Sequence, residues 1–90
     1  MINREAAENA LIAMCAIEDA MDMFDSIGLN LDDGKSKAGG KLYKALDCMS
    51  KTVAAYLKIN IEDDKAMQKI DEFARNHSAD DTHAIGWFLP

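Results

Sequence analysis

Residues 10–24 decide the fold of this 90-residue chain, and they run Ala-Leu-Ile-Ala-Met-Cys-Ala-Ile-Glu-Asp-Ala-Met-Asp-Met-Phe. Apolar side chains recur there in steps of four and three, the spacing of one helix face, at Ala10, Met14, Ile17, Met21 and Phe24. Their neighbours widen this stripe: Leu11, Ile12 and Cys15. The pattern predicts a helix over residues 3 to about 27, with Asn3 as its N-cap and Gly28 as its left-handed C-terminal residue.

A second apolar stripe with the same steps follows a loop at residues 28–36, and it consists of Leu42, Leu46, Met49, Val53 and Tyr56. It predicts a helix over residues 37–59, with Ser36 as its N-cap. Glycine costs about 1 kcal/mol relative to alanine inside a helix. Because Gly39 and Gly40 stand in the first turn, we expect the regular helix to begin near Lys41.

The last third of the chain predicts a third helix from residue 61 to about 76, capped by Asn60. Its buried face is expected to hold Met67, Ile70, Phe73 and Ala74. Ser78 and Asp81 suggest a cap for a short fourth helix over residues 79–86. No strand pattern competes, so the sequence predicts one all-α domain over residues 1–90. The expected architecture is a small helical bundle: an antiparallel helical hairpin, a third helix and a short C-terminal helix.

The composition sets limits on function. Hydrophobic residues make up 49% of the chain, and 16 acidic residues against 10 basic ones give a net charge of −6. This charge disfavours direct binding to nucleic acid or to an anionic membrane. The longest apolar run, at 10–17, is too short to span a bilayer, and the charged start of the chain lacks a secretory signal. We therefore expect a cytoplasmic protein whose two cysteines are thiols.

Charge is distributed unevenly along the chain. Residues 1–27 carry one basic and six acidic side chains, a net −5, whereas residues 37–59 carry five lysines and one aspartate, a net +4. The lysines of the second helix share one side of it, and they are Lys37, Lys41, Lys44, Lys51 and Lys58. Four acidic residues follow a similar line on the first helix: Glu8, Glu18, Asp22 and Asp25.

In an antiparallel hairpin with this loop, Asp25 would come near Lys41 and Asp22 near Lys44. We interpret the two charged lines as pairing across the two helices, an effect that sets register more than stability because exposed ion pairs contribute about 0–1 kcal/mol. Two alternatives remain open. The lysine line can instead bind phosphate, or the lines can pair between the subunits of a homodimer.

Motifs for catalysis or metal binding are incomplete. Glu5 with Glu8 and Asp22 with Asp25 have the spacing of Mg²⁺-binding pairs, but both pairs fall on one helix, and the second helix offers a lone Asp47. A Zn²⁺ site needs more ligands than His77 and His83. The glycines of residues 34–41 lack the spacing of a phosphate loop. We therefore expect no enzyme activity, cofactor or metal.

The sequence favours a small acidic protein that binds another protein, such as an inhibitor or adaptor of the kind phages and mobile elements encode. It would occupy a basic surface of its partner, for example of a nucleic-acid-binding protein. The candidate partner-binding residues are Glu18, Asp19, Asp22, Asp25, Asp32, Asp33, Trp87 and Phe88. The apolar end of the chain either folds back onto the bundle or anchors the partner. Two alternatives are an oligomeric protein that sequesters small anions or nucleotides through Lys37, Lys41, Lys44 and Lys51, and a metal-dependent nucleotide phosphohydrolase.

Overall fold

Three helices form the fold of the computed structural model, which describes residues 2–28, 36–77, 86 and 88. Helix α1 spans Arg4–Ser26, α2 spans Lys37–Leu57 and α3 spans Asp64–Asn76. Within the described residues there is no strand, which confirms the all-α class. The short fourth helix was predicted over residues 79–86, which lie outside the described residues apart from Gly86.

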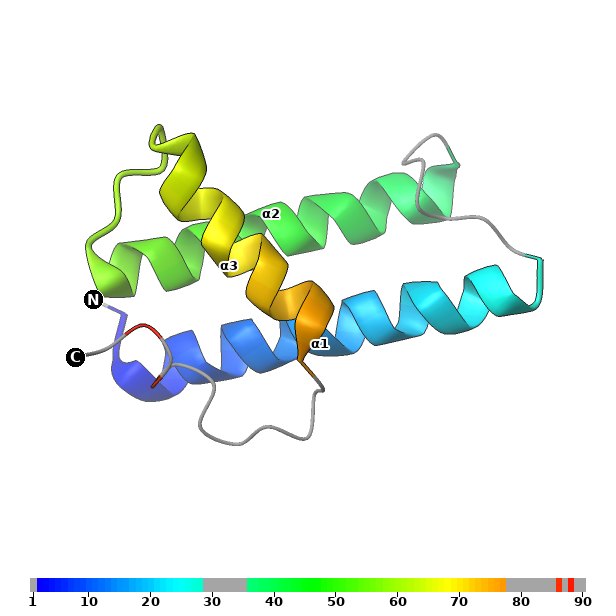
Figure 1. Cartoon of the computed structure of the whole chain (residues 1–90), viewed down its shortest axis with the longest axis horizontal. Coiled ribbons are helices and arrows are strands. Elements are labelled where there is room, and N and C mark those ends of the chain that lie inside the picture. The colour runs from blue at the N-terminus through cyan, green and yellow to red at the C-terminus, as the bar shows by residue number, and fades with distance from the viewer. Residues whose placement is uncertain (1, 29–35, 78–85, 87, 89–90) are drawn as a thin grey trace.

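Figure 1 shows α1 and α2 side by side and running in opposite directions, with α3 crossing over both. The most extensive helix contact is between α1 and α2, and α3 touches each of them. Because α3 is the shortest helix, it covers only the half of the pair that holds the start of α1 and the end of α2. The end of α1 and the start of α2 project beyond it.

Local sequence signals explain the ends of α1 and the start of α2. The Asn3 Oδ1 accepts a hydrogen bond from the Ala6 N–H at 2.8 Å, and the Ser36 hydroxyl accepts one from the Gly39 N–H at 2.9 Å. Gly28 has a φ of 86° and donates its N–H to the Asp25 carbonyl. These three predicted helix-end residues are confirmed. Helix α2 nevertheless begins at Lys37 rather than near Lys41. The Ser36 side chain accepts a backbone N–H of the first turn, and this hydrogen bond stabilises the turn despite its two glycines.

The predicted start of the third helix was wrong. Asn60 uses its side-chain oxygen to accept the Glu62 N–H at 3.0 Å, which forms a turn rather than a helix cap. Asp63 is the N-cap, and its carboxylate accepts the Ala66 N–H at 3.2 Å. Asn60 and Asp63 can both serve as N-cap residues. Because Asn60 forms a turn, α3 begins only after Asp63.

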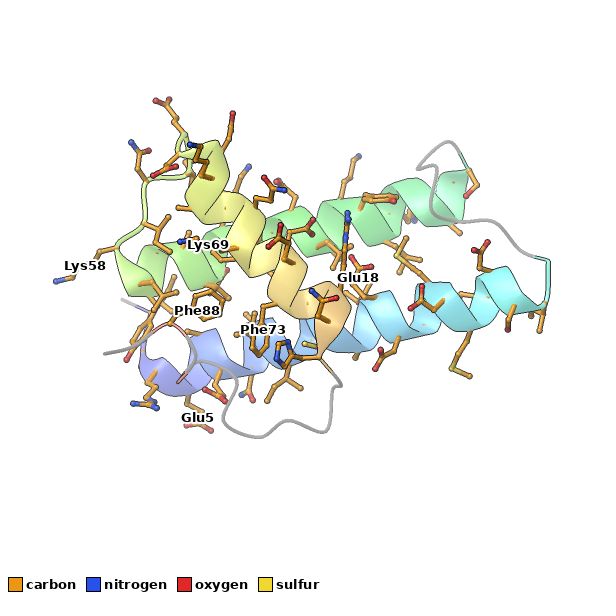
Figure 2. The ribbon with its side chains drawn as sticks, in the orientation of Figure 1. Glu5, Glu18, Lys58, Lys69, Phe73 and Phe88 are labelled. Atoms are coloured by element: carbon orange, nitrogen blue, oxygen red, sulfur yellow. The ribbon has the colours of Figure 1, made fainter. Side chains whose placement is uncertain are left out.

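Helix α2 ends in a strained conformation at Lys58, which has a φ of 59°. Its neighbour Ile59 donates an N–H to the Ala54 carbonyl at 2.9 Å and closes the helix end. The Lys58 side chain points away from the bundle (Figure 2). A residue with a Cβ pays about 1 kcal/mol or more for this conformation, which glycine adopts freely.

Replacing Lys58 with glycine is therefore expected to raise the free energy of unfolding by up to about 1 kcal/mol, measured by urea unfolding. The matched control is Ala55→Gly, at an exposed position inside the same helix, which should lower it by about 1 kcal/mol. Equal losses in both variants would contradict the left-handed geometry at Lys58.

The core lies where the three helices meet. Helix α1 contributes Ala7, Leu11, Met14, Cys15 and Met21; α2 contributes Leu46, Val53 and Ala54; α3 contributes Ile70, Phe73 and Ala74. In α3 the predicted face is confirmed, with Met67 partly buried beside it. Figure 2 shows Phe88 near Phe73, and the two rings are 5.5 Å apart, so Phe88 extends the core.

The predicted stripe of α1 is rotated relative to the observed core. Met14 and Met21 are buried, but Ile17 is only half-buried and Phe24 is 38% exposed. The centre of the buried face lies instead on the side of Leu11 and Cys15. Helix α1 contacts α3 as well as α2, so its buried face has to serve two neighbours and is wider than a stripe that faces α2 alone.

Candidate functional site

The acidic residues predicted on the first helix occupy its last three turns. Asp19, Asp22 and Asp25 are exposed, and Glu18 is half-buried. Figure 2 shows Glu18 between α1 and α2, close to the end of α3. Asp32 and Asp33 lie outside the described residues, as does Trp87. The part of the predicted site that the structure describes is therefore the end of α1.

A hollow of about 440 Å³ opens beside two of these carboxylates. It is lined by Glu18 and Asp22 from α1, by Tyr43 from α2 and by Arg75 from α3. Asp19 lies further round the helix and does not line it. Tyr43 and Arg75 were not predicted as site residues, because the periodicity of α3 does not show where its last turn meets the other helices.

Arg75 already has an acidic partner within its own helix. Its guanidinium lies 3.1 Å from the carboxylate of Asp71, one turn earlier. Asp22 and Asp25 form no ion pair with Lys41 or Lys44 in the described part of the chain, although the sequence suggested both pairs. Asp22 instead shares the hollow with Tyr43, the residue before Lys44.

Backbone charge reinforces this negative region. The carbonyl end of a helix carries a partial negative charge of about half an electron, which basic side chains in the last turn commonly offset. Helix α1 has no basic residue in its last turn, and Asp25 adds a carboxylate there. The negative potential at the end of α1 is therefore stronger than its side chains alone would produce.

Exposed apolar side chains surround the same end of α1. Met23 is 70% exposed and Ile27 is 71% exposed, one helical turn apart. Methionine and other large apolar side chains are enriched at the cores of protein interfaces, although single exposed ones also occur on monomers. Met23 and Ile27 were not predicted as site residues, because the hydrophobic stripe alone does not show where α3 stops.

The predicted lysine line lies on exposed turns of α2. Lys37, Lys41, Lys44 and Lys58 are exposed, and the structure gives no ion pair for them within the described residues. Lys51 is different, because its ammonium lies 2.9 Å from the Asp47 carboxylate in the same helix. The line thus provides four lysines, and none of these four lines one of the hollows described here.

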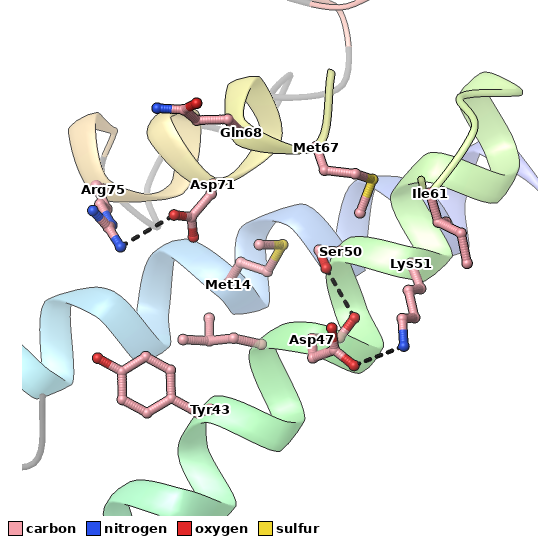
Figure 3. Close-up of a pocket in the computed structure, with 11 residues that line it drawn as sticks. Met14, Tyr43, Asp47, Ser50, Lys51, Ile61, Met67, Gln68, Asp71 and Arg75 are labelled. Carbon is pink, nitrogen blue, oxygen red and sulfur yellow. Dashed lines mark hydrogen bonds and ion pairs between the residues drawn. The ribbon is translucent and has the colours of Figure 1, made fainter. Parts of the chain in front are cut away.

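A second hollow, of about 470 Å³, separates α2 from α3 (Figure 3). Its floor is apolar and includes Met14, Leu46 and Met67. Its charged side chains occur as the two ion pairs already described, Asp47 with Lys51 and Asp71 with Arg75. A cation that is held by a carboxylate is a weaker anion ligand, so this groove does not favour phosphate binding.

The remaining chemical candidates are dispersed. Within residues 2–28 and 36–77, no group of three or more potential ligand side chains is placed to hold a metal ion. Cys15 is buried and Cys48 is exposed, and neither forms a disulfide within the described residues. His77 stacks on Phe73 with ring centroids 3.9 Å apart, and its Nδ1 lies 3.0 Å from the Phe73 carbonyl oxygen.

Comparison with known proteins gives no family assignment: no protein-family model, no curated protein and no solved structure matches this chain. The helices in the described ranges all lack the combination of length and apolar character needed to cross a membrane.

Proposed function

We propose that the protein acts by binding another protein through an acidic surface at the end of α1, formed by Glu18, Asp22 and Asp25. The observation that carries this proposal is the concentration of carboxylates in the second half of α1, beside the end of α3, without basic residues in the last turn of α1. The partner would present a basic segment, and we expect the encounter to take place in the reducing cytoplasm.

The hollow suits a lysine or arginine side chain of such a partner. Its volume of about 440 Å³ is ample for one long side chain, and two carboxylates line it together with Arg75. The guanidinium of Arg75 is itself paired with Asp71, which offsets its repulsion of a second cation. A carboxylate pair around a cation gives charge-assisted hydrogen bonds, which are stronger than neutral ones. The phenol ring of Tyr43 at the same hollow offers a surface on which a cationic group can stack.

The exposed apolar residues would add to this binding. Met23 and Ile27 lie on the same projecting end, within reach of a segment that docks there. Burying apolar surface favours association, and the part of this gain that exceeds the entropy cost of binding appears as affinity. Charge complementarity would then set the rate of encounter and the choice of partner, and the apolar contacts would slow dissociation.

The test is capture and affinity with a charge-reversed variant. Asp22→Lys with Asp25→Lys should abolish the capture of a basic partner from host extract and weaken its affinity, measured by calorimetry, at least about tenfold. The matched control is Glu5→Lys with Glu62→Lys, two exposed acidic positions elsewhere, which changes the net charge equally from −6 to −2.

The control variant should retain the partner, and binding by the wild type should weaken as salt concentration rises. Equal loss in both variants would show that bulk charge, not the end of α1, attracts the partner. Unchanged binding by the Asp22 and Asp25 variant would exclude this surface.

A further inference from the structure

The two hollows of the molecule join at one end of the space between α2 and α3. Tyr43 of α2 and Arg75 of α3 line both the acidic hollow, beside Glu18 and Asp22, and the larger hollow, which we call the α2–α3 groove. Figure 3 shows Tyr43 and Arg75 at one end of this groove and Ile61 toward the other. The acidic hollow is therefore continuous with the α2–α3 groove.

The α2–α3 groove leaves apolar surface accessible. Ile61 is 52% exposed at its far end, Tyr43 is 38% exposed where the groove joins the acidic hollow, and Met67 is half-buried in the wall. Met14 and Leu46 are buried and close the floor. Because methionine side chains adapt their shape to what they contact, a groove that contains two of them can accept apolar side chains of different form.

The joined surface is negatively charged. Four acidic and two basic side chains line it, a net charge of −2: Glu18, Asp22, Asp47 and Asp71 against Lys51 and Arg75. Both basic side chains are paired with a carboxylate of their own helix, so the excess of carboxylates lies at the end next to Tyr43. A complementary partner carries its positive charge at that end and its apolar side chains further along the groove.

The walls of the groove decide which backbone conformation fits into it. Helices α2 and α3 line it with side chains, and their backbone groups are hydrogen-bonded within each helix. An extended segment would leave its own backbone N–H and C=O groups without partners in the apolar part of the groove. A helix satisfies these groups internally, and an amphipathic helix in a groove is a recurring mode of protein recognition.

We propose that a basic amphipathic helix of a partner protein lies along the α2–α3 groove and places a lysine or arginine in the acidic hollow. This inference rests on the proposed function, since it names the kind of segment that the acidic surface binds. The groove is lined by residues 43–51 of α2 and residues 67–75 of α3, each about 12 Å of helix. Over that length a docked helix presents three side chains, at one position and four and about seven residues further on.

The size and the rim of the groove agree with such an occupant. The groove and the acidic hollow have volumes of about 470 and 440 Å³, and sites that enclose a ligand commonly have about 300–1,000 Å³. The two ion pairs, Asp47 with Lys51 and Asp71 with Arg75, keep exposed side chains along the groove. An apolar floor with a polar rim is the arrangement of protein interfaces.

Selection from a library of random peptides on the full chain tests the proposal. The peptides have about 16 residues, enough for four helical turns. Those retained should share a lysine or arginine with large apolar residues four and about seven positions away, and circular dichroism should show that they gain helix on binding. Retained peptides that are basic but lack this apolar spacing would overturn the proposal, as would a selection that retains no peptide.

The variant Ser50→Phe tests the groove itself. Ser50 lines the groove, and its hydroxyl donates to the Asp47 carbonyl at 2.8 Å within its own helix, so phenylalanine fills the groove without a change in charge. The affinity for a selected peptide, measured by fluorescence anisotropy, should fall at least about tenfold. The matched control Ala55→Phe, at an exposed position of α2 outside the groove, should stay within about twofold of the wild type. Unchanged affinity in Ser50→Phe would overturn the proposal.

The variant Ile61→Gln tests how the helix is aligned. It removes exposed apolar surface at the far end of the groove without adding charge. It should weaken a selected peptide about threefold to tenfold, and have much less effect once the apolar residue furthest from the peptide's basic one is alanine, because the two side chains contact each other. Equal weakening of both peptides would overturn this alignment. Far-UV circular dichroism must show unchanged helix content in every variant that is compared.

The failure of this inference can be distinguished from the failure of the proposed function. If Asp22→Lys with Asp25→Lys abolishes peptide binding while Ser50→Phe leaves it intact, the acidic surface stands and the α2–α3 groove is excluded. If the charge-reversed variant binds the peptides as tightly as the wild type, the proposed function fails, and this inference fails with it.

Discussion

Replacing Phe73 with alanine is expected to lower the free energy of unfolding by about 3–5 kcal/mol. Phe73 is 5% exposed, its ring stacks on His77, and the ring of Phe88 packs against it at 5.5 Å. The change removes buried apolar surface and leaves a cavity where α3 meets the rest of the core. A chain of this length has a total stability of about 5–13 kcal/mol, so the loss is a large part of it.

Urea unfolding followed by far-UV circular dichroism measures this loss, and Phe73→Leu provides a graded companion. Leucine keeps part of the volume but no aromatic ring, so its loss should be smaller, at about 1–2 kcal/mol. The companion keeps the result measurable if the alanine variant does not fold. A loss below about 1 kcal/mol for Phe73→Ala would mean that α3 is not held through this residue.

Replacing Met21 with alanine should have the next largest effect, a loss of about 2–4 kcal/mol in the free energy of unfolding. Met21 is 1% exposed although its neighbour Asp22 is exposed and lines an open hollow. The contact between α1 and α2 is the most extensive one in the molecule. A large loss would show that the second half of α1 packs closely in the core.

Met23→Ala is the matched control, since it makes the same chemical change two residues away at a side chain that is 70% exposed. Its effect should stay within about 0.5 kcal/mol. The two losses in the free energy of unfolding, measured in the same urea experiment, show which side of α1 faces the core. A much larger loss for Met21→Ala means that the side of Met21 is buried and the side of Met23 is not. Equal losses would contradict this orientation of α1.

The positions of the helices could be predicted because the residues that determine them lie close together in the sequence. A cap residue and the spacing of apolar side chains act within a few residues, so Asn3, Ser36 and Gly28 could be assigned from sequence. The error at Asn60 is of a different kind. Both Asn60 and Asp63 are good cap residues, and the choice between them depends on the turn that leads into α3.

The rotation of the helices was not predictable from periodicity. The apolar residues of α1 and of α2 cover more of each helix than one neighbouring helix can bury. The sequence does not indicate which edge of each stripe lies in the core. Helix α3 contacts both of the other helices, and the fully buried residues include Leu11 of α1 and Ala54 of α2. Because α3 is linked to the pair only by tertiary contacts, its position is not encoded in any single stretch of sequence.

The acidic residues of the candidate site could be predicted from the sequence, but the residues that complete the hollow could not. The spacing of acidic residues placed Glu18 and Asp22 on one part of α1, and the structure shows them lining one hollow. The other walls, Tyr43 and Arg75, come from helices whose meeting point depends on the crossing of α3. The exposure of Met23 has the same cause, because it depends on where α3 ends.

The short reach of α3 also divides the molecule into regions of unequal local stability. Backbone amides in the half covered by three helices can exchange with solvent deuterium only when most of the domain opens. Those near the last turn of α1 and the first turn of α2 are released by separation of two helices alone, a smaller fluctuation. The end that carries the carboxylates is thus also the one that can adjust its shape to a bound protein at the lowest cost in free energy.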